Sequence, residues 1–226
     1  MGADEGSATR VGTKRERTER ELKDAARRVL SRDGYVNTKI GDIAEEAGKA
    51  TGLFYKYFKN KEGLLLSLAD EFRLALRRNI RSTLLRGEDP FENLRNMISA
   101  FCSVYKQFDS VAIAVFQASM VDESFAVMWK KIRAEGIRIS STRILLLQRM
   151  GFFIGIDPNA AASILCSMIE FTCYNWAIEK KEFGEFEKAG NDDILVNTLT
   201  NMVVRMFGEG DEILGHRLER KNLSER

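Results

Sequence analysis

The chain has 226 residues, of which 44% are hydrophobic and 30% are charged, and its formal net charge is +2. A chain of this length and composition can bury the core of one large domain or of two small ones. Because it has no apolar run of about 18 residues and no apolar segment near its N-terminus, we expect neither a membrane span nor a secretory signal. We therefore expect a cytoplasmic protein.

The chain contains three cysteines and one histidine, which limits the metal and catalytic chemistry open to it. Cys102, Cys166 and Cys173 are widely spaced in apolar surroundings, so we expect buried free thiols. His216 lies in a charged tail and no Cys-x-x-Cys pair occurs, so we expect no zinc site. The sequence shows no Ser-His-Asp or Cys-His set and no phosphate-binding glycine loop, so we expect no enzyme and no cofactor.

Apolar residues recur with helical spacing along the chain, and only two prolines and no alternating β-branched run occur, which predicts an all-α protein. The first helix is expected over about residues 14–33 and ends at Gly34, which can adopt a left-handed conformation. Thr38 is the expected cap of a second helix, and Gly48 breaks that helix after about two turns.

A third, short helix is expected over about residues 51–58, with Phe54 and Phe58 one turn apart and facing inward. Asn60 is the expected cap of a long fourth helix that ends near Leu85. Two short helices that are joined by a tight glycine turn and rest on a preceding helix form a helix-turn-helix. The pattern therefore predicts a three-helix helix-turn-helix domain at the N-terminus.

This N-terminal part is basic, and its third helix is rich in aromatic residues. Between Arg10 and Lys61 there are 14 Lys and Arg against eight Asp and Glu, whereas residues 62–226 have 21 against 23. Once the two phenylalanines face inward, helical spacing turns the following residues outward: Lys49, Thr51, Gly52, Leu53, Tyr55, Lys56 and Tyr57. Lysine and tyrosine contact phosphate oxygens and glycine permits a close approach, so the pattern indicates a DNA-binding surface. The alternative is the solvated face of a small helical bundle.

The remaining helices are longer and more apolar. Asp-Pro pairs are typical of helix starts, so helices are expected to begin at Pro90 and Pro158. The expected helices cover about residues 90–108, 109–120, 123–150, 158–181 and 192–207. The expected domain organisation is a tail over 1–12, the helix-turn-helix domain over 13–60, a helical domain over 61–208 and a second tail over 209–226.

Two of these helices have more apolar surface than a single core can cover. The segment NAAASILCSMIEFTCYNWAIE, which follows Pro158, is apolar nearly all round. The last helix carries a similar set: Ile194, Leu195, Leu199, Met202, Val203 and Met206. We therefore expect a homodimer in which these two helices and their symmetry mates form a four-helix bundle.

Aromatic and sulfur-containing residues are dense in the same half of the chain. The candidate pocket set is Phe101, Tyr105, Phe108, Phe116, Met120, Met128, Trp129, Phe171, Tyr174 and Asn175. Apolar residues that recur every three or four positions more often belong to the hydrophobic core than to a binding site. A few polar groups among many apolar ones are, however, also typical of a small-molecule pocket. Glu170 is the only charge in the middle of its helix, and it is expected either in an ion pair at the dimer interface, which we favour, or as an anchor in the pocket.

The segment AARRVLSRDGYVNTKIGDIAEEAGKATGLFYKYFKNKEGLL resembles the DNA-binding domain of the TetR family of bacterial transcription regulators. The resemblance covers about residues 22–65. It is carried by the Ala-Ala pair of the first helix, Gly34, Thr38, Ile43-Ala44, Ala47-Gly48, Gly52, Tyr55, Phe58 and Lys61-Glu62. Beyond Leu85 only the number, length and apolarity of the helices agree with the family.

The resemblance implies roles for individual residues. It places Thr38, Tyr55, Tyr57 and Lys61 on DNA phosphates and Lys49, Thr51 and Leu53 near base edges. The complete implied DNA-binding set is Thr38, Lys39, Lys49, Thr51, Gly52, Leu53, Tyr55, Lys56, Tyr57 and Lys61. Where the family commonly has serine before the recognition helix, this chain has Ala50, so Thr51 is expected either to cap that helix or to face the bases. The basic segment Arg10–Arg20 is expected to lie along the DNA or to be a solvated extension of the first helix.

The family also implies a mode of action. We expect a repressor that binds a palindromic operator in double-stranded DNA as a homodimer and is released when a lipophilic small molecule or acyl chain enters the aromatic pocket. The long fourth helix, which joins the two domains, is the expected route of this response. The alternatives are a ligand-independent helical DNA-binding protein and a helical small-molecule-binding protein or enzyme.

Overall fold

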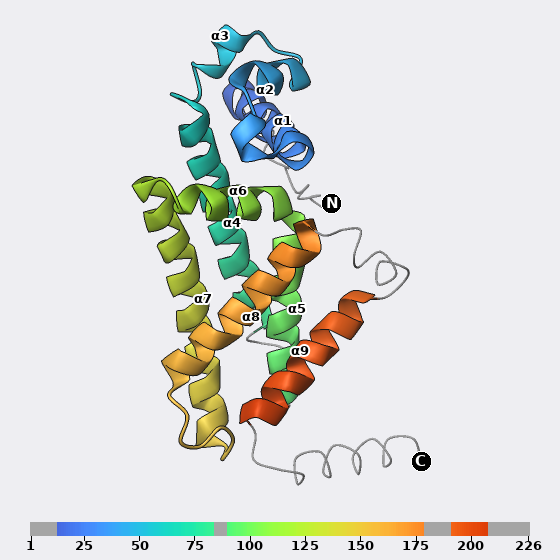
Figure 1. The fold of residues 1–226 in the computed structure, drawn as a ribbon, viewed down its shortest axis with the longest axis vertical. Helices are drawn as coiled ribbons and strands as arrows, with labels where there is room; N and C mark the ends of the chain where they lie inside the picture. The colour runs from blue at the N-terminus through green and yellow to red at the C-terminus, as the bar shows by residue number, and fades with distance from the viewer. Residues whose placement is uncertain (1–12, 84–89, 179–190, 208–226) are drawn as a thin grey trace, which may run out of the picture. The chain divides into compact units, whose positions relative to one another are not determined.

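The computed structural model describes residues 13–83, 90–178 and 191–207, and these residues contain helices and no strand (Figure 1). This confirms the all-α prediction. The chain divides into two compact units, of which the first ends at Leu68 and the second begins at Ala69. The expected tails over 1–12 and 209–226 lie outside the described residues, as does Asp89. No described helix has both the length and the apolarity needed to cross a membrane.

The first unit contains α1 (Lys14–Asn37), α2 (Ile40–Glu46), α3 (Thr51–Phe54) and the beginning of α4 (Lys61–Ser82). α2 packs against both α1 and α3. A capping box between Thr13 and Glu16 starts α1, because each side chain accepts a hydrogen bond from the other residue's backbone N–H. Gly34 has a non-helical conformation with a φ of +72°, so the first helical run ends there as expected, and one short turn follows it within α1.

The core of this unit comes from small and branched side chains on α1 and α4, together with Ile43 and Ala44 of α2. α1 buries Leu22, Ala25, Ala26, Val29 and Leu30 in one stripe, as its periodicity predicts. The first two turns of α4 add Leu64, Leu65 and Leu68, which lie beside α1. The Asn60 side chain accepts a hydrogen bond from the Gly63 N–H at 2.8 Å, which confirms Asn60 as the cap of α4.

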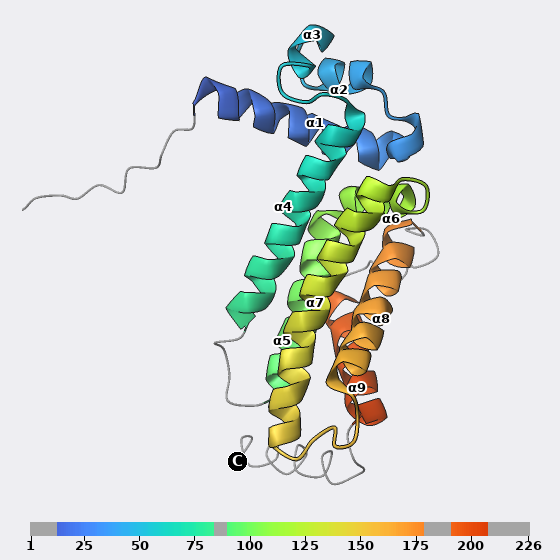
Figure 2. The ribbon, with the colours of Figure 1, turned by 90° about the vertical axis from the view of Figure 1, so that its left-hand side faces the viewer.

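The second unit contains the rest of α4 and five further helices: α5 (Pro90–Gln107), α6 (Asp109–Ser119), α7 (Glu123–Arg149), α8 (Pro158–Ile178) and α9 (Asn191–Phe207). α7 packs against α6 and α8, and α5 packs against α8 and α9 (Figures 1 and 2). The Asp157 carboxylate accepts a hydrogen bond from the Ala160 N–H at 2.7 Å, so the second Asp-Pro pair caps a helix as expected.

A buried arginine links three helices of the second unit. Arg143 on α7 is 5% exposed, and its guanidinium donates to the Ile80 and Asn93 carbonyls and to the Thr83 hydroxyl. Ile80 and Thr83 are at the C-terminal end of α4, where helix carbonyls have no intrahelical partner. Arg143 therefore supplies hydrogen bonds to that helix end, at the cost of its own desolvation, which lowers its pKa.

Candidate nucleic-acid interface and small-molecule pocket

Two phenylalanines hold α3 against the first unit, as the sequence predicts. Phe54 is fully buried and Phe58 is 7% exposed, and their ring centroids are 5.5 Å apart. Gly48, with a φ of +64°, makes the turn between α2 and α3, and the Lys49 N–H donates to the Ala44 carbonyl at 2.8 Å. The regular helix ends at Phe54, and hydrogen-bonded turns continue the chain to Phe58.

The opposite side of α3 faces outward. Thr51, Gly52, Tyr55 and Lys56 are exposed, and the exposed fraction of Tyr55 is 57%. Leu53 and Tyr57 are partly buried, and the Arg15 guanidinium lies 6.0 Å from the Tyr57 ring centroid. Ala50 stands at the N-cap and forms no side-chain cap. Since Thr51 is the first residue of α3, it does not take over the capping role that the sequence left open, and its side chain stays on the outer face.

Two residues expected on DNA phosphates point inward instead. Thr38 is 2% exposed, and its hydroxyl donates to the Gly34 carbonyl at 2.7 Å, so it closes α1 and does not cap α2. The Lys61 ammonium donates to the Tyr35 and Thr38 carbonyls at 2.9 and 3.0 Å and lies 4.4 Å from the Tyr35 ring centroid. Both side chains have hydrogen-bond partners within the protein, and their contact with DNA stays a prediction.

Lys39 and Lys49, which lie just before α2 and α3, are at or near the surface. Lys39 is exposed at the N-cap of α2, and its backbone N–H donates to the Asp42 carboxylate at 3.2 Å. Lys49 is partly buried and forms an ion pair with Glu21 of α1 at 3.0 Å. Hydrogen bonds from Lys49 and Arg17 lower the pKa of the Glu21 carboxyl, so Glu21 stays charged beside the candidate interface.

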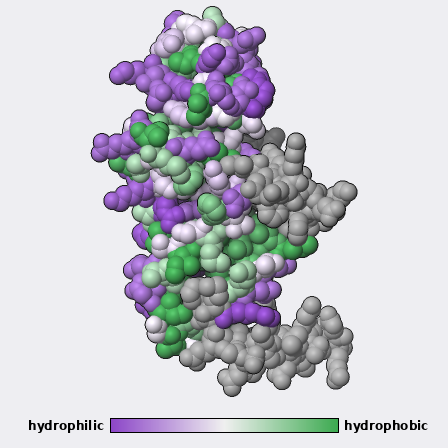
Figure 3. Space-filling model, in the orientation of Figure 1, coloured by the Kyte–Doolittle hydropathy of each residue, from purple (hydrophilic) through white to green (hydrophobic). Residues whose placement is uncertain are grey.

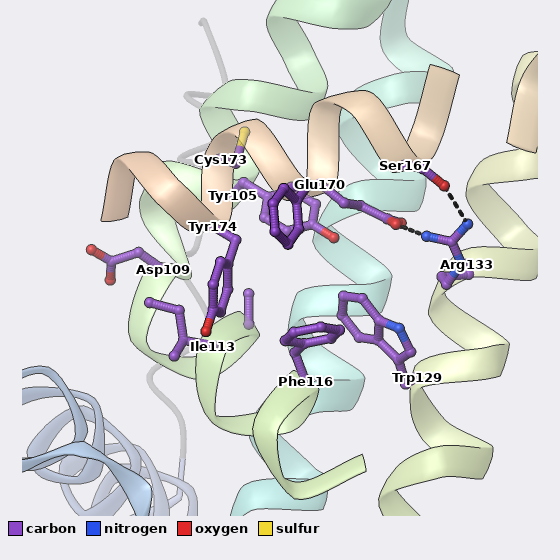
Figure 4. Close-up of a pocket in the computed structure, with 12 residues that line it drawn as sticks. Tyr105, Asp109, Ile113, Phe116, Trp129, Arg133, Ser167, Glu170, Cys173 and Tyr174 are labelled. Atoms are coloured by element: carbon purple, nitrogen blue, oxygen red, sulfur yellow. Dashed lines mark hydrogen bonds and ion pairs between the residues drawn. The ribbon is translucent and has the colours of Figure 1, made fainter. Parts of the chain in front are cut away.

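A cavity of about 270 Å³ opens among α5, α6, α7 and α8 of the second unit (Figure 4). Five of the ten expected pocket residues line it: Tyr105, Phe116, Trp129, Phe171 and Tyr174. The Phe116 ring lies 5.4 Å from Trp129 and 5.3 Å from Tyr174, so the walls are largely aromatic. The other expected residues are elsewhere: Phe101 and Phe108 are core, Met120 is 67% exposed, and Met128 and Asn175 are partly buried outside the lining.

The lining also contains polar residues that the sequence analysis did not assign to it. They are Asp109, Arg133, Ser167 and Cys173, with Glu170 left undecided between pocket and interface. Glu170 is 6% exposed and forms an ion pair with Arg133, which also donates to the Ser167 hydroxyl at 3.0 Å (Figure 4). The structure therefore places Glu170 in the pocket, which corrects our preference for the interface. From the sequence, the charge of Glu170 within an apolar helix indicates that a cationic partner is needed. It does not indicate that Arg133 is that partner.

All three cysteines are free and buried, as expected. Cys173 of α8 lines the pocket and interacts with Cys102 of α5, while Cys166 lies 3.9 Å from the Ser140 hydroxyl. The contact with Cys102 and burial raise the pKa of Cys173, and burial raises that of Cys166. Thiols in this state are poor nucleophiles and good apolar packing groups.

Large apolar side chains remain uncovered on α8 and α9. Ile164 is 48% exposed, Ile194 52% and Met202 46%. Apolar side chains gather on the face that carries these two helices (Figure 3). In contrast, the inward residues of α9, Val196, Leu199 and Val203, are buried against α5. Surplus apolar surface of this kind is typical of a protein interface.

The fold and the two sites define a helix-turn-helix protein with a second helical unit that contains an aromatic pocket. Residues 22–68 match the family model described as bacterial regulatory proteins, tetR family. BetI, an HTH-type transcriptional regulator of Agrobacterium fabrum, is 29% identical over 126 residues, which are 56% of this chain and 54% of BetI. The fatty acid metabolism regulator protein of Bacillus subtilis is 48% identical over 48 residues, which are 21% of this chain and 25% of that protein.

A solved structure shows that the likeness extends to the whole fold. FadR from Bacillus subtilis in complex with stearoyl-CoA superposes with a TM-score of 0.66 at 22% identity, over 82% of this chain and 97% of FadR. The two sequence matches, in contrast, span about half or less of the relatives' own lengths. Residues 22–68 thus carry the domain of the tetR family of bacterial regulatory proteins, and the similarity to FadR shows that the helices after it share the fold of that regulator.

Proposed function

We propose that this protein is a transcription regulator, by default a repressor, that binds a palindromic site in double-stranded DNA as a homodimer. The observation that carries the proposal is the outer side of α3, where Thr51, Gly52, Tyr55 and Lys56 are exposed while Phe54 and Phe58 fix the helix from behind. A glycine, a phenol and a lysine side by side suit a phosphate backbone. The match of residues 22–68 to the tetR family model supports the same function.

Selection of the preferred site from a random pool of duplex DNA tests this proposal. A dimer with two helix-turn-helix units is expected to select a palindrome whose half-sites are about 34–36 Å apart, one turn of the double helix, or a multiple of that distance. Binding is expected to weaken steeply as salt rises, because phosphate contacts release counterions. If the purified protein enriches no sequence and binds no duplex at low salt, the proposal is wrong.

Leu53 is the residue of α3 that we expect to read sequence through an apolar contact. A partly buried leucine on a recognition helix can pack against the methyl group of thymine, which predicts an A·T pair opposite it. Leu53→Ser is expected to cost about 1–3 kcal/mol of discrimination at that position while leaving the other positions of the site unchanged. Repeating the selection with this variant measures the change, and an identical preferred site would contradict the assignment.

The ion pair between Lys49 and Glu21 is expected to restrain DNA binding. Glu21→Gln removes a negative charge beside the interface and frees Lys49, so DNA affinity is expected to rise a few-fold and the salt slope to steepen by about 0.9. Fluorescence anisotropy between about 50 and 200 mM salt measures both quantities. Glu19→Gln is the matched control, since Glu19 belongs to the same helix but pairs with Lys23. A lower affinity of Glu21→Gln would refute the role assigned to the pair.

We further propose that a lipophilic small molecule or acyl chain occupies the aromatic cavity and releases the protein from DNA. The cavity supports a small-molecule ligand, and so does the FadR neighbour, whose structure is a complex with stearoyl-CoA. α4 contributes residues to both units of the chain, so its position can depend on what fills the second unit. A ligand acts in this way only if it binds the DNA-free arrangement more tightly than the DNA-bound one. Unchanged operator affinity at saturating ligand would show that binding is ligand-independent.

A further inference from the structure

The polar groups inside the cavity are few, and they differ in what they leave unsatisfied. Tyr105 comes from α5, Arg133 from α7, and Ser167 and Glu170 from α8. Asp109 is at the edge of the cavity, where its carboxylate points away from the aromatic rings (Figure 4). The inner polar groups are thus the Tyr105 phenol, one hydroxyl and one pair of opposite charges, beside the phenol of the partly buried Tyr174.

The phenol of Tyr105 is a hydrogen-bond donor that has no partner among the residues that the structure describes. The residue is 5% exposed, and its oxygen is buried without a hydrogen bond. The ring cannot turn away easily, because it stacks on Phe101 at 5.2 Å and meets the edge of Phe72 at 5.0 Å. Burial raises the pKa of Tyr105 well above its usual value, so the group keeps its proton. A buried donor without an acceptor destabilises the protein, and an acceptor on a ligand would remove that cost.

The cation of the cavity, in contrast, is already neutralised. Arg133 forms an ion pair with the nearly buried Glu170 and donates to Ser167 (Figure 4). No other cation lines the cavity among the described residues. An anionic ligand would therefore meet the Glu170 carboxylate without a free positive charge, and taking such an anion out of water is costly.

The cavity is large enough for a ligand of moderate size. A water molecule takes about 30 Å³ in the liquid, so a cavity of about 270 Å³ has room for at least about nine or ten non-hydrogen atoms. The apolar walls match a hydrocarbon body of that size.

We propose that the cavity binds an uncharged, medium-sized lipophile with one hydrogen-bond acceptor, such as the carbonyl of a ketone or an ester, which accepts from the Tyr105 hydroxyl. The paired state of Arg133 and Glu170 discriminates against the carboxylate of the same length. This assignment deepens the proposed effector function and rests on it.

Three probes of nearly equal shape test the assignment by calorimetry and ligand-induced thermal shift. 2-Octanone carries the acceptor, 2-methyl-1-octene replaces it with a CH₂ group, and octanoate carries the charge. We expect the protein to bind 2-octanone about tenfold more tightly than the alkene or octanoate at neutral pH. Octanoate binding as tight as that of 2-octanone, or no binding of 2-octanone at about 1 mM, would overturn the proposal.

Two substitutions locate the effect. Tyr105→Phe keeps the ring and is expected to weaken 2-octanone about tenfold while leaving the alkene affinity unchanged. Glu170→Gln frees Arg133 and is expected to raise octanoate affinity at least tenfold. An unchanged 2-octanone affinity in Tyr105→Phe would refute the hydrogen bond, and an unchanged octanoate affinity in Glu170→Gln would refute the charge argument.

DNA binding is measured on the same samples, so that the two proposals can fail separately. A protein that binds its DNA site but prefers octanoate contradicts the ligand class and leaves DNA binding intact. A protein that binds 2-octanone through Tyr105 but binds no DNA supports the ligand class and contradicts the proposed function. Circular dichroism of each variant confirms that a lost affinity does not reflect a lost fold.

Discussion

Phe54→Ala is expected to abolish DNA binding by loosening α3 from the first unit. Phe54 is fully buried and contacts the rings of Tyr55 and Phe58, so its removal leaves a cavity under the recognition helix. A change of this kind costs about 3–5 kcal/mol, which is a large part of the stability of a small unit. Urea unfolding followed by circular dichroism measures the loss of stability, and fluorescence anisotropy with the selected DNA site measures the loss of binding.

Tyr55→Phe is the matched control, because it changes the neighbouring residue on the outer side of the same helix. The tyrosine is 57% exposed, and the substitution keeps its ring against Phe54 while removing the hydroxyl. The free energy of unfolding of the Tyr55→Phe variant is expected to equal that of the unmodified protein. Its DNA affinity is expected to fall about tenfold, because one hydrogen bond to a phosphate is lost. If Phe54→Ala retains full DNA affinity, or if Tyr55→Phe is as unstable as Phe54→Ala, the proposed division of α3 into an inner and an outer side is wrong.

Ile164→Asp and Met202→Asp are each expected to separate the homodimer and thereby to weaken operator binding. Both residues are about half exposed on the apolar face of α8 and α9, where a second copy would cover them. A carboxylate buried between two copies without a partner is expected to weaken association at least a hundredfold, which corresponds to about 2.8 kcal/mol. A monomer holds only one half-site, so operator affinity falls with the dimer. Analytical ultracentrifugation and anisotropy measure the two effects.

Val127→Asp controls for the introduced charge. Val127 is 47% exposed, nearly the same as Ile164 at 48%, but it is on α7. This variant is expected to remain dimeric and to bind the operator with unchanged affinity. Dimers that persist in both the Ile164 and the Met202 variants would show that the homodimer uses another surface.

The helices were predictable because the signals that define them are local. A repeat of apolar residues every three or four positions, a cap such as Asn60 or Asp157, and a glycine such as Gly48 each act within a few residues of the chain. The same holds for the inward side of α3, since the spacing of Phe54 and Phe58 already determines which residues lie opposite. The end of the first helical run at Gly34 was predicted correctly, but the short turn after it was not predicted.

The sequence did not predict the contacts of side chains whose partners are far away along the chain. Lys61 has the charge and position of a phosphate contact, yet carbonyls of the α1–α2 connection hold it. Half of the expected pocket residues pack elsewhere, because helical spacing identifies an apolar side chain but not the helix that it meets.

The amino-acid order by itself determined the all-α architecture, the helix-turn-helix and the exposure of Thr51, Gly52, Tyr55 and Lys56, since each of these depends on neighbours within about one or two helical turns. Only the tertiary structure decided that Glu170 meets Arg133 and that the Tyr105 hydroxyl stays unpaired in a cavity. Those two facts depend on how α5, α7 and α8 pack against one another, and packing is set by the shapes of many side chains at once rather than by any periodicity along one helix.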